Sequence, residues 1–299
     1  MRVVARLIPC ALLTAALVPA LAAQEGISAA DQPIFRTSVE MVSLAAVVRN
    51  RQGRVVRSLS REDFEVLDSG TPTRLVDVRT EVAAPASVAL LVDSSGSMRV
   101  GHSLDAARLA ADEVLDYLDQ GRDEASLLTF DSRLLQLQEF TNDFEPIRMR
   151  LEDLDAFGTT SLYDAIAESA RTVAPRARHR RAILVLTDCA DTSSSLGPAE
   201  VSAIASGIDV PVYVFALGSD KTEGPLVDLA RWTGGEFYVA TDARRATLAI
   251  QQFIDELRHQ YVLAFEPSDV EGWRRVEIRT RRPGLTVRAR SWYRAGASE

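Results

Sequence analysis

The residues with the clearest chemical potential are short oxygen-bearing side chains that follow two apolar runs. The first run ends at Asp93, with Ser95 and Ser97 at alternate positions beyond it, and the second ends at Thr187 and Asp188. Oxygen ligands of this kind suit Mg²⁺, Mn²⁺ or Ca²⁺, and none of these positions offers a soft ligand such as His or Cys. The pattern therefore predicts a site for a hard divalent cation. Because the hydroxyls are neutral, the cation would keep enough charge to accept an anionic ligand from outside.

A glycine turn between the two runs adds further hydroxyls. Gly158 is followed by Thr159 and Thr160, and a helical pattern begins immediately after them. In an open α/β sheet, ligand sites form outside the carboxyl ends of the strands, near the point where the strand order reverses. We therefore expect the carboxylates and hydroxyls to converge on one crevice.

The elements that must position these residues alternate between strand and helix. Continuous apolar runs at 88–92, 182–186 and 212–217 are typical of strands buried on both faces. Longer helical faces pass through 104–118 and 250–261, and shorter helices are expected at 144–151, 162–172, 198–206 and 224–233. This alternation predicts a doubly wound, mostly parallel open α/β sheet of Rossmann-like type.

Both flanks of this core have a β-strand pattern. Strand candidates occur before it at 39–48, 64–67 and 75–78, and after it at 261–265, 275–280 and 285–292. We expect an N-terminal β segment over 37–84 and a C-terminal one over 262–299. Because β segments lie on both sides of the core, we predict that they build one small β module.

At this point the chain resembles a known family, the von Willebrand factor type A domain, which we place at residues 85–261. Asp93, Ser95 and Ser97 match its metal-ion-dependent adhesion site. The resemblance implies that Ser95, Ser97 and Thr160 ligate the metal directly, and that Asp93 and Asp188 act directly or through water.

Thr159 competes with Thr160 for the remaining threonine position of that site. The run Leu-Tyr-Asp-Ala that begins at Leu162 resembles one that is common in bacterial members, and this alignment favours Thr160. Cys189 departs from the family, which usually has glycine after the aspartate. A thiol there could be a redox handle or simply a small residue tolerated in a loop. Asp191 is either a carboxylate that supports the site or part of a surface loop.

The longer pattern resembles an exported bacterial subgroup with β segments on both sides of the A domain. It includes the stretch 62–66 and the Arg-Pro-Gly-Leu sequence around Pro283. This wider resemblance covers most of the chain after its first residues.

The first residues predict export. Arg2 and Arg6 precede an apolar stretch at 7–22, which ends in small residues. We predict a signal peptide at 1–22, a flexible leader at 23–36 and a periplasmic or secreted protein. A membrane anchor is the alternative, but the apolar stretch is short for a spanning helix and contains two prolines. Cleavage would remove Cys10, and removing two arginines would change the net charge from −8 to −10.

Composition excludes several classes of protein. The chain has 299 residues, of which 46% are hydrophobic and 25% charged, so it is neither a disordered chain nor a disulfide-stapled miniprotein. Its net charge of −8 disfavours nucleic-acid binding, and its three scattered histidines give no zinc cluster. Eight arginines against three acids at 271–299 indicate solvated strand faces, pairing with the acidic core, or binding to an acidic envelope polymer.

These observations predict a non-enzymatic binding module. Its cation, Mg²⁺ or else Mn²⁺ or Ca²⁺, would capture an Asp or Glu side chain of a protein partner. The alternatives are a metal-dependent hydrolase that uses the same cation, and a metal-free structural component of the envelope. The sequence contains no Gly-x-Ser-x-Gly elbow and shows no positioned general base, which disfavours the hydrolase. His102 is expected to face solvent.

Overall fold

The architecture is taken from a computed structural model, which describes residues 41–80, 83–176, 180–218, 224–268 and 270–296. The predicted signal peptide and leader, with Arg2, Arg6 and Cys10, lie outside the described residues. Contacts group residues 39–299 into one unit. Among the described residues, no helix is long and apolar enough to cross a membrane.

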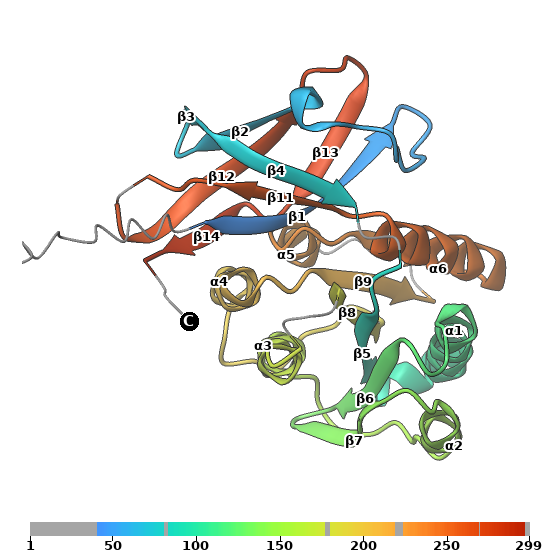
Figure 1. Ribbon diagram of the computed structural model, residues 1–299. Helices are drawn as coiled ribbons and strands as arrows, with labels where there is room; N and C mark the ends of the chain where they lie inside the picture. Colours follow the sequence, from blue (N-terminus) through green and yellow to red (C-terminus); the bar gives the residue numbers. More distant parts are fainter. Residues whose placement is uncertain (1–40, 81–82, 177–179, 219–223, 269, 297–299) are drawn as a thin grey trace, which may run out of the picture. The chain divides into compact units, whose positions relative to one another are not determined.

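A six-stranded sheet forms the centre of this unit (Figure 1). Its order is β10-β9-β8-β5-β6-β7, and all neighbours are parallel except the edge pair β6 and β7. The strands are β5 (Ala86–Asp93), β6 (Glu124–Phe130), β7 (Leu134–Thr141), β8 (Arg180–Thr187), β9 (Val212–Leu217) and β10 (Phe237–Ala240). Every residue of β5 and β9 is buried, as expected for apolar strands that are covered on both faces.

Helices cover both faces of the sheet, which confirms the doubly wound α/β fold. They are η2 (Gly96–His102), α1 (Ser103–Tyr117), α2 (Glu145–Glu152), α3 (Leu162–Val173), α4 (Pro198–Ile208), α5 (Gly224–Trp232) and α6 (Ala243–Arg258). One apolar cluster joins the sheet to α1, α2 and α6, and a second joins it to α3, α4 and α5. α1 to α5 begin and end within a few residues of the expected ranges, whereas α6 begins at Ala243, well before the expected 250, and η2 was not expected.

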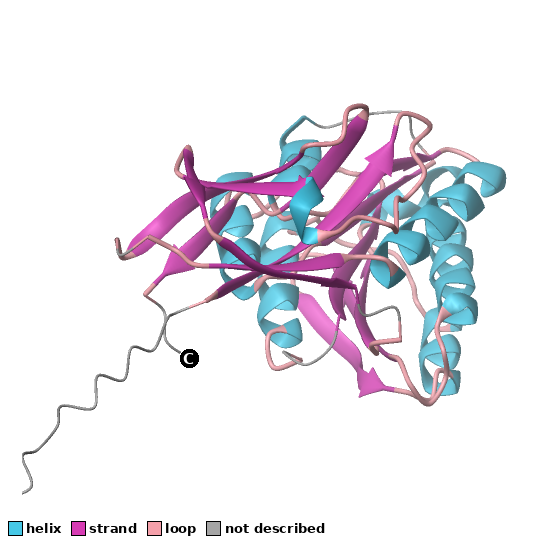
Figure 2. Ribbon diagram, turned by 45° about the horizontal axis from the view of Figure 1, so that its top comes forward, coloured by secondary structure: helices cyan, strands magenta, loops and turns pink. Residues whose placement is uncertain are grey.

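The two flanks pair with each other in two antiparallel four-stranded sheets (Figure 2). One has the order β13-β1-β11-β4 and the other β14-β12-β2-β3. A short 3-10 helix, η1 (Arg61–Asp63), precedes β2. The strands are β1 (Val42–Asn50), β2 (Phe64–Asp68), β3 (Thr71–Thr73), β4 (Leu75–Thr80), β11 (Tyr261–Phe265), β12 (Gly272–Thr280), β13 (Leu285–Ala289) and β14 (Trp292–Ala295). The prediction of one β module from both flanks is confirmed, and its core lies between the two sheets.

The strand expected at 285–292 is in fact two strands. β13 ends at Ala289, and β14 begins at Trp292 in the other sheet. Between them, Arg290 forms a β-bridge with Thr233, and the Ser291 N–H donates to the Trp232 carbonyl. These contacts draw the chain toward the end of α5, so it leaves one sheet before it enters the other.

Buried ion pairs join the module to the central α/β domain. Arg49 of β1 and Arg288 of β13 both contact Glu256 of α6, whose side chain is fully buried. The same two arginines contact Glu236, which lies just before β10. We call Arg49, Arg288, Glu236 and Glu256 the junction cluster.

Candidate metal site

The strand order brings the predicted site residues to one edge of the central sheet. Asp93 is the last residue of β5, and Asp188 directly follows β8. These strands are parallel neighbours in register, with Val92 opposite Leu186. The two carboxylates therefore leave adjacent strands at their carboxyl ends, as the apolar runs predicted.

Asp93 is fully buried, and hydroxyl and amide groups hold it in place. The Thr187 hydroxyl donates to its Oδ2 at 2.6 Å, and the Ser95 N–H donates to its Oδ1 at 2.9 Å. The pKa of Asp93 is raised to about 6, mainly by burial and also by the nearby charge of Asp188, while these hydrogen bonds offset part of the rise. Asp93 is thus a buried carboxylate whose negative charge is costly.

The loop after β5 presents its serines together. The Ser95 and Ser97 hydroxyl oxygens lie 3.1 Å apart, and Ser95 is buried. The Gly96 N–H donates to the Gly158 carbonyl at 3.1 Å. A Cβ at Gly96 would lie 3.3 Å from that same carbonyl oxygen, so glycine permits this close approach. This loop is thereby joined to the segment that carries Thr160.

The two candidate threonines differ in their surroundings. Thr160 is buried; its N–H donates to the Thr192 hydroxyl at 3.0 Å, and its carbonyl accepts from the backbone N–H groups of Thr192 and Ser193. These bonds use only its backbone groups. Thr159 is exposed, and its hydroxyl accepts from the Ser193 hydroxyl at 3.2 Å. Thr159 and Thr160 therefore differ in burial and in whether a hydrogen bond engages the side-chain hydroxyl.

Two further aspartates support this region. Asp191 accepts from the Leu162 N–H at 2.9 Å and from the Ser194 hydroxyl at 2.6 Å, so it caps the start of α3. Asp164 accepts from the backbone N–H groups of Ser195 and Leu196. The serine-rich stretch after Asp191 could have indicated these hydrogen bonds, but the sequence analysis did not predict them.

Cys189 occupies a backbone position that favours glycine. It is buried, its φ is +70°, and its N–H donates to the Thr187 hydroxyl at 3.0 Å. This left-handed conformation explains why the resemblance led us to expect glycine here.

The donor set fits a hard divalent cation. Carboxylates come from Asp93 and Asp188, and hydroxyls from the two serines and Thr160. None of the ion pairs within the described residues includes either aspartate, so no arginine or lysine there neutralises them. Nor do the described residues contain a group of three or more His, Cys, Asp or Glu side chains that could hold a metal. His102 is exposed and lies beside Asp105, as expected for a solvent-facing residue.

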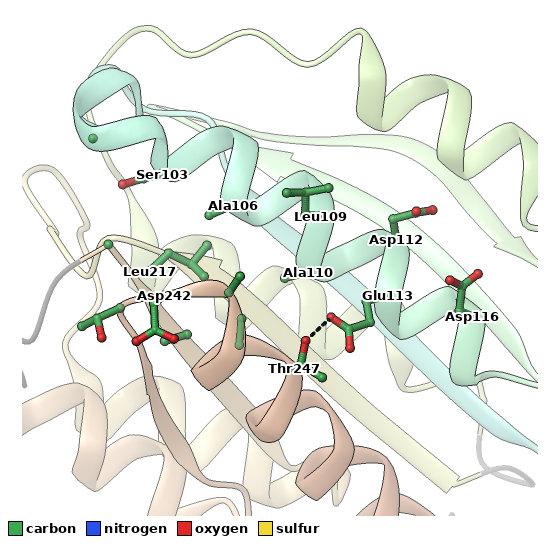
Figure 3. A pocket seen from close by; sticks show the side chains of 16 residues that line it. Ser103, Ala106, Leu109, Ala110, Asp112, Glu113, Asp116, Leu217, Asp242 and Thr247 are labelled. Carbon is green, nitrogen blue, oxygen red and sulfur yellow. Dashed lines mark hydrogen bonds between the residues drawn. The ribbon is translucent and has the colours of Figure 1, made fainter.

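Two hollows that sequence analysis did not find lie nearby. One, of about 290 Å³, adjoins the serine loop at Ser94 and is lined by Phe130, Leu135 and Phe157 among others. The other, of about 420 Å³, lies between α1 and α6 (Figure 3). The Thr247 hydroxyl donates to Glu113 across this second pocket at 3.0 Å.

Residues 88–198 match the sequence model of the von Willebrand factor type A domain. Together with the fold and the sheet-edge geometry, this match shows that the protein contains a von Willebrand factor type A domain. Domains of this family often carry a metal-ion-dependent adhesion site, mediate protein interactions and are usually non-catalytic. Comparison with curated proteins gives no match for the chain.

Several solved structures have a similar fold. The conserved hypothetical protein BatB from Bacteroides thetaiotaomicron is 21% identical, with a TM-score of 0.50, over 57% of this chain and 98% of that one. A von Willebrand factor type A protein from Catenulispora acidiphila is 13% identical, with a TM-score of 0.53, over 88% of this chain and 76% of that one. Proximal thread matrix protein 1 from the mussel byssus, with a zinc-occupied adhesion-site motif, is 13% identical. It aligns over 62% of this chain and 49% of its own, with a TM-score of 0.51. At these identities the likeness shows the fold alone.

Proposed function

We propose that the protein is a divalent-cation-dependent protein-binding module. Its cation would be held by Asp93, Ser95, Ser97, Thr160 and Asp188, and completed by an Asp or Glu side chain of a partner. The observation that carries the proposal is the burial of Asp93 among hydroxyl and amide donors, with no cationic side chain of the described residues paired to it. A bound cation would supply the missing positive charge, and an incoming carboxylate would complete its coordination.

The cation itself is the first thing to test. Calorimetric titration with Mg²⁺ and Mn²⁺ should give one site per chain in the wild type and none in Asp93→Ala. The fold should survive this substitution, because it lies at the end of a strand and removes no apolar contact. Absence of cation binding by the folded wild type would instead support the structural-component alternative.

The two threonines provide a matched pair. Thr160→Ala should weaken Mn²⁺ binding about tenfold, the equivalent of about 1.4 kcal/mol. Thr159→Ala should leave it within about twofold, because its exposed hydroxyl is already engaged by Ser193. If Thr159 matters and Thr160 does not, the assignment of the ligand threonine is wrong.

Capture of a carboxylate can be tested without knowing the partner. With Mn²⁺ bound, an N-acetylated and C-amidated peptide Gly-Asp-Gly should displace metal-bound water and lower the water proton relaxation enhancement, whereas the same blocked peptide with Asn in place of Asp should not. A pull-down from envelope extract, with and without chelator, would then identify the partner. If the wild type captures the same proteins equally in Mg²⁺ and in chelator, capture does not use the metal.

The hollow beside Ser94 offers a place for the partner residue next to the metal-bound carboxylate. Phe157 is 60% exposed on its rim. Phe157→Ser should weaken capture of the identified partner and leave cation affinity unchanged. Equal affinity of this variant for the partner would show that the hollow is not used.

Export is part of the same proposal, as are the domain limits 37–84, 85–261 and 262–299. The mature protein should begin near Ala23 and be recovered from the periplasm or the medium. N-terminal sequencing that finds Met1 on protein in the membrane pellet would contradict export. The hydrolase alternative remains to be tested by turnover assays with ester, phosphate and peptide substrates.

A further inference from the structure

Two tryptophans and two arginines alternate on an exposed face of the β module. In the antiparallel register of β12 and β14, Trp273 lies opposite Arg294 and Arg275 lies opposite Trp292. All four residues are exposed, whereas Tyr293 and Ala295, which alternate with those on β14, are buried. The tryptophans therefore occupy one diagonal of the face and the arginines the other. We call these four residues the Trp–Arg face.

The tryptophans retain much of their surface. Trp273 is 48% exposed and Trp292 is 43% exposed. Indole is among the largest apolar groups a protein can bury, and aromatic rings and arginines are the residue types enriched where surfaces bind a ligand. Diagonal neighbours on adjacent strands lie about 7–8 Å apart, which places both rings within reach of one extended ligand.

The arginines of this face differ from most others in the C-terminal segment. Of the eight arginines at 271–299, five form ion pairs: Arg274, Arg279, Arg282, Arg288 and Arg290. Arg275 and Arg294 take part in none of the ion pairs among the described residues, nor in the arginine–ring contacts found there. The basic excess predicted from sequence is thus largely used within the fold, and two of the remaining charges flank the exposed tryptophans.

The backbone beneath the face is held firmly. Arg274 pairs with Asp68 at 2.7 Å, and the ring of Tyr293 packs edge-on against Phe265. The Trp273 indole passes close to α4, where a Cβ at Gly207 would lie only 3.0 Å from its Cη2. A ring fixed in this way loses little conformational entropy when a ligand stacks on it.

We propose that the Trp–Arg face binds an acidic polysaccharide. An indole can stack on the apolar face of a sugar ring, and a guanidinium forms paired hydrogen bonds with a carboxylate. The alternation of ring and cation matches a polymer whose sugars each carry a pyranose face and a negative group. This site is separate from the proposed metal site, whose residues follow β5 and β8 or, in the case of Thr160, precede α3.

Other polyanions fit the face less well. The net charge of −8 on the chain opposes every polyanion, so a nucleic acid, whose affinity comes mainly from many phosphate contacts, would gain little from the two arginines of this face. Glu277 is also exposed on β12, next to Arg275 along this face. A bilayer surface would require a larger apolar area than two half-exposed rings supply.

Oligogalacturonate is a suitable probe, because its methyl ester has the same sugars without the charge. Titrations of the full mature chain in chelator should show binding of the acid form that weakens with salt, and binding of the ester at least about fivefold weaker. Working in chelator separates this result from the proposed metal function.

Double variants separate the contribution of ring stacking from that of the arginine charges. Trp273→Ala with Trp292→Ala should reduce affinity for both forms at least about tenfold. Arg275→Gln with Arg294→Gln should reduce affinity for the acid form to that of the ester. Arg279→Gln is the matched control: it lies on the same strand and face but is already paired with Glu277 at 2.7 Å, and it should change affinity less than about twofold.

Thermal unfolding must show that each variant is folded. If the tryptophan pair does not fold, Gly207→Ala displaces the Trp273 ring without removing it and should still weaken stacking. The proposal is overturned if the wild type does not bind oligogalacturonate, or if Arg279→Gln loses as much affinity as the face variants. It is also overturned if a single-stranded oligonucleotide or phosphatidylglycerol vesicles bind more tightly through the same residues.

Discussion

Buried carboxylates have different kinds of partner in two regions of this protein. In and beside the β module, Asp68 is paired with Arg274, Asp123 with Arg258, and Glu256 with two arginines of the junction cluster. At the carboxyl edge of the central sheet, Asp93 is equally buried but receives only hydroxyl and amide hydrogen bonds.

The pKa values follow this division. Burial raises the pKa of Asp68 and Asp123, but their arginine and backbone hydrogen bonds outweigh burial and bring both below the usual range. The pKa of Asp93, by contrast, is raised to about 6. Among the described residues, arginines pair with these structural acids and none pairs with Asp93, which is the arrangement expected if Asp93 binds a cation as proposed.

The largest effect on stability should come from deleting the C-terminal strands that pair with the N-terminal strands of the β module. β12 is the partner of β2, and β13 is a partner of β1. Deleting residues 270–299 should therefore destabilise the N-terminal strands as well, and hydrogen exchange of amides in β1 and β2 should accelerate by orders of magnitude. Unchanged protection of residues 42–80 would contradict a shared module.

The junction cluster should be the most sensitive point for a single substitution. Glu256→Ala leaves Arg49 and Arg288 to share only the partly exposed Glu236, and removing the fully buried partner of such a pair costs about 3–5 kcal/mol. Urea unfolding should show a loss of that size. Glu277→Ala, which breaks an exposed pair with Arg279, should cost less than about 1 kcal/mol.

Acid should weaken the arginine-paired region. Because the pKa of Asp68 is lower in the folded protein than in the unfolded chain, its stabilisation is complete above the unfolded value of about 3.9. It is then lost as the pH falls through the lower, folded pKa. At pH 7, Asp68→Asn should cost about 3 kcal/mol, because it leaves Arg274 unpaired.

Chemical unfolding at several pH values tests the direction of this pH dependence. The stability difference between wild type and Asp68→Asn should shrink as the pH falls below about 4. A difference that stayed constant with pH would show that packing, rather than the charge of Asp68, is responsible.

Local sequence patterns predicted much of the fold and the place of the candidate site. Apolar runs at β5, β8 and β9 mark strands buried on both faces, and the side chains that follow a strand must lie at its carboxyl end. β6, β7 and β10 were not identified in advance. β7 is an edge strand with a half-exposed, irregular pattern, and β10 has only four residues.

What the sequence could not supply depends on contacts between distant residues. Nothing local shows that Glu256 lies among arginines from β1 and β13, or that Thr160 is buried while Thr159 is exposed. The split of 285–292 into two strands likewise follows from contacts of Arg290 and Ser291 near the end of α5.

The contrast between Asp93 and Asp68 is tested most directly by a substitution that removes only the charge of Asp93. In chelator, Asp93→Asn should keep or raise the free energy of unfolding, by less than about 1 kcal/mol, because a buried and unpaired charge is replaced by a neutral amide. The same change at Asp68 should be strongly destabilising, since that carboxylate neutralises Arg274.

Added Mg²⁺ should reverse the order of stability of the wild type and Asp93→Asn. At a Mg²⁺ concentration about 100 times the dissociation constant, binding stabilises the wild type by about 2.7 kcal/mol. Asp93→Asn has lost a charged ligand and should gain much less, so the wild type becomes the more stable protein. Urea unfolding of both proteins in chelator and in Mg²⁺ measures this crossing. If Asp93→Asn instead cost several kcal/mol in chelator, Asp93 would be a structural acid like Asp68, and the contrast between the two regions would fail.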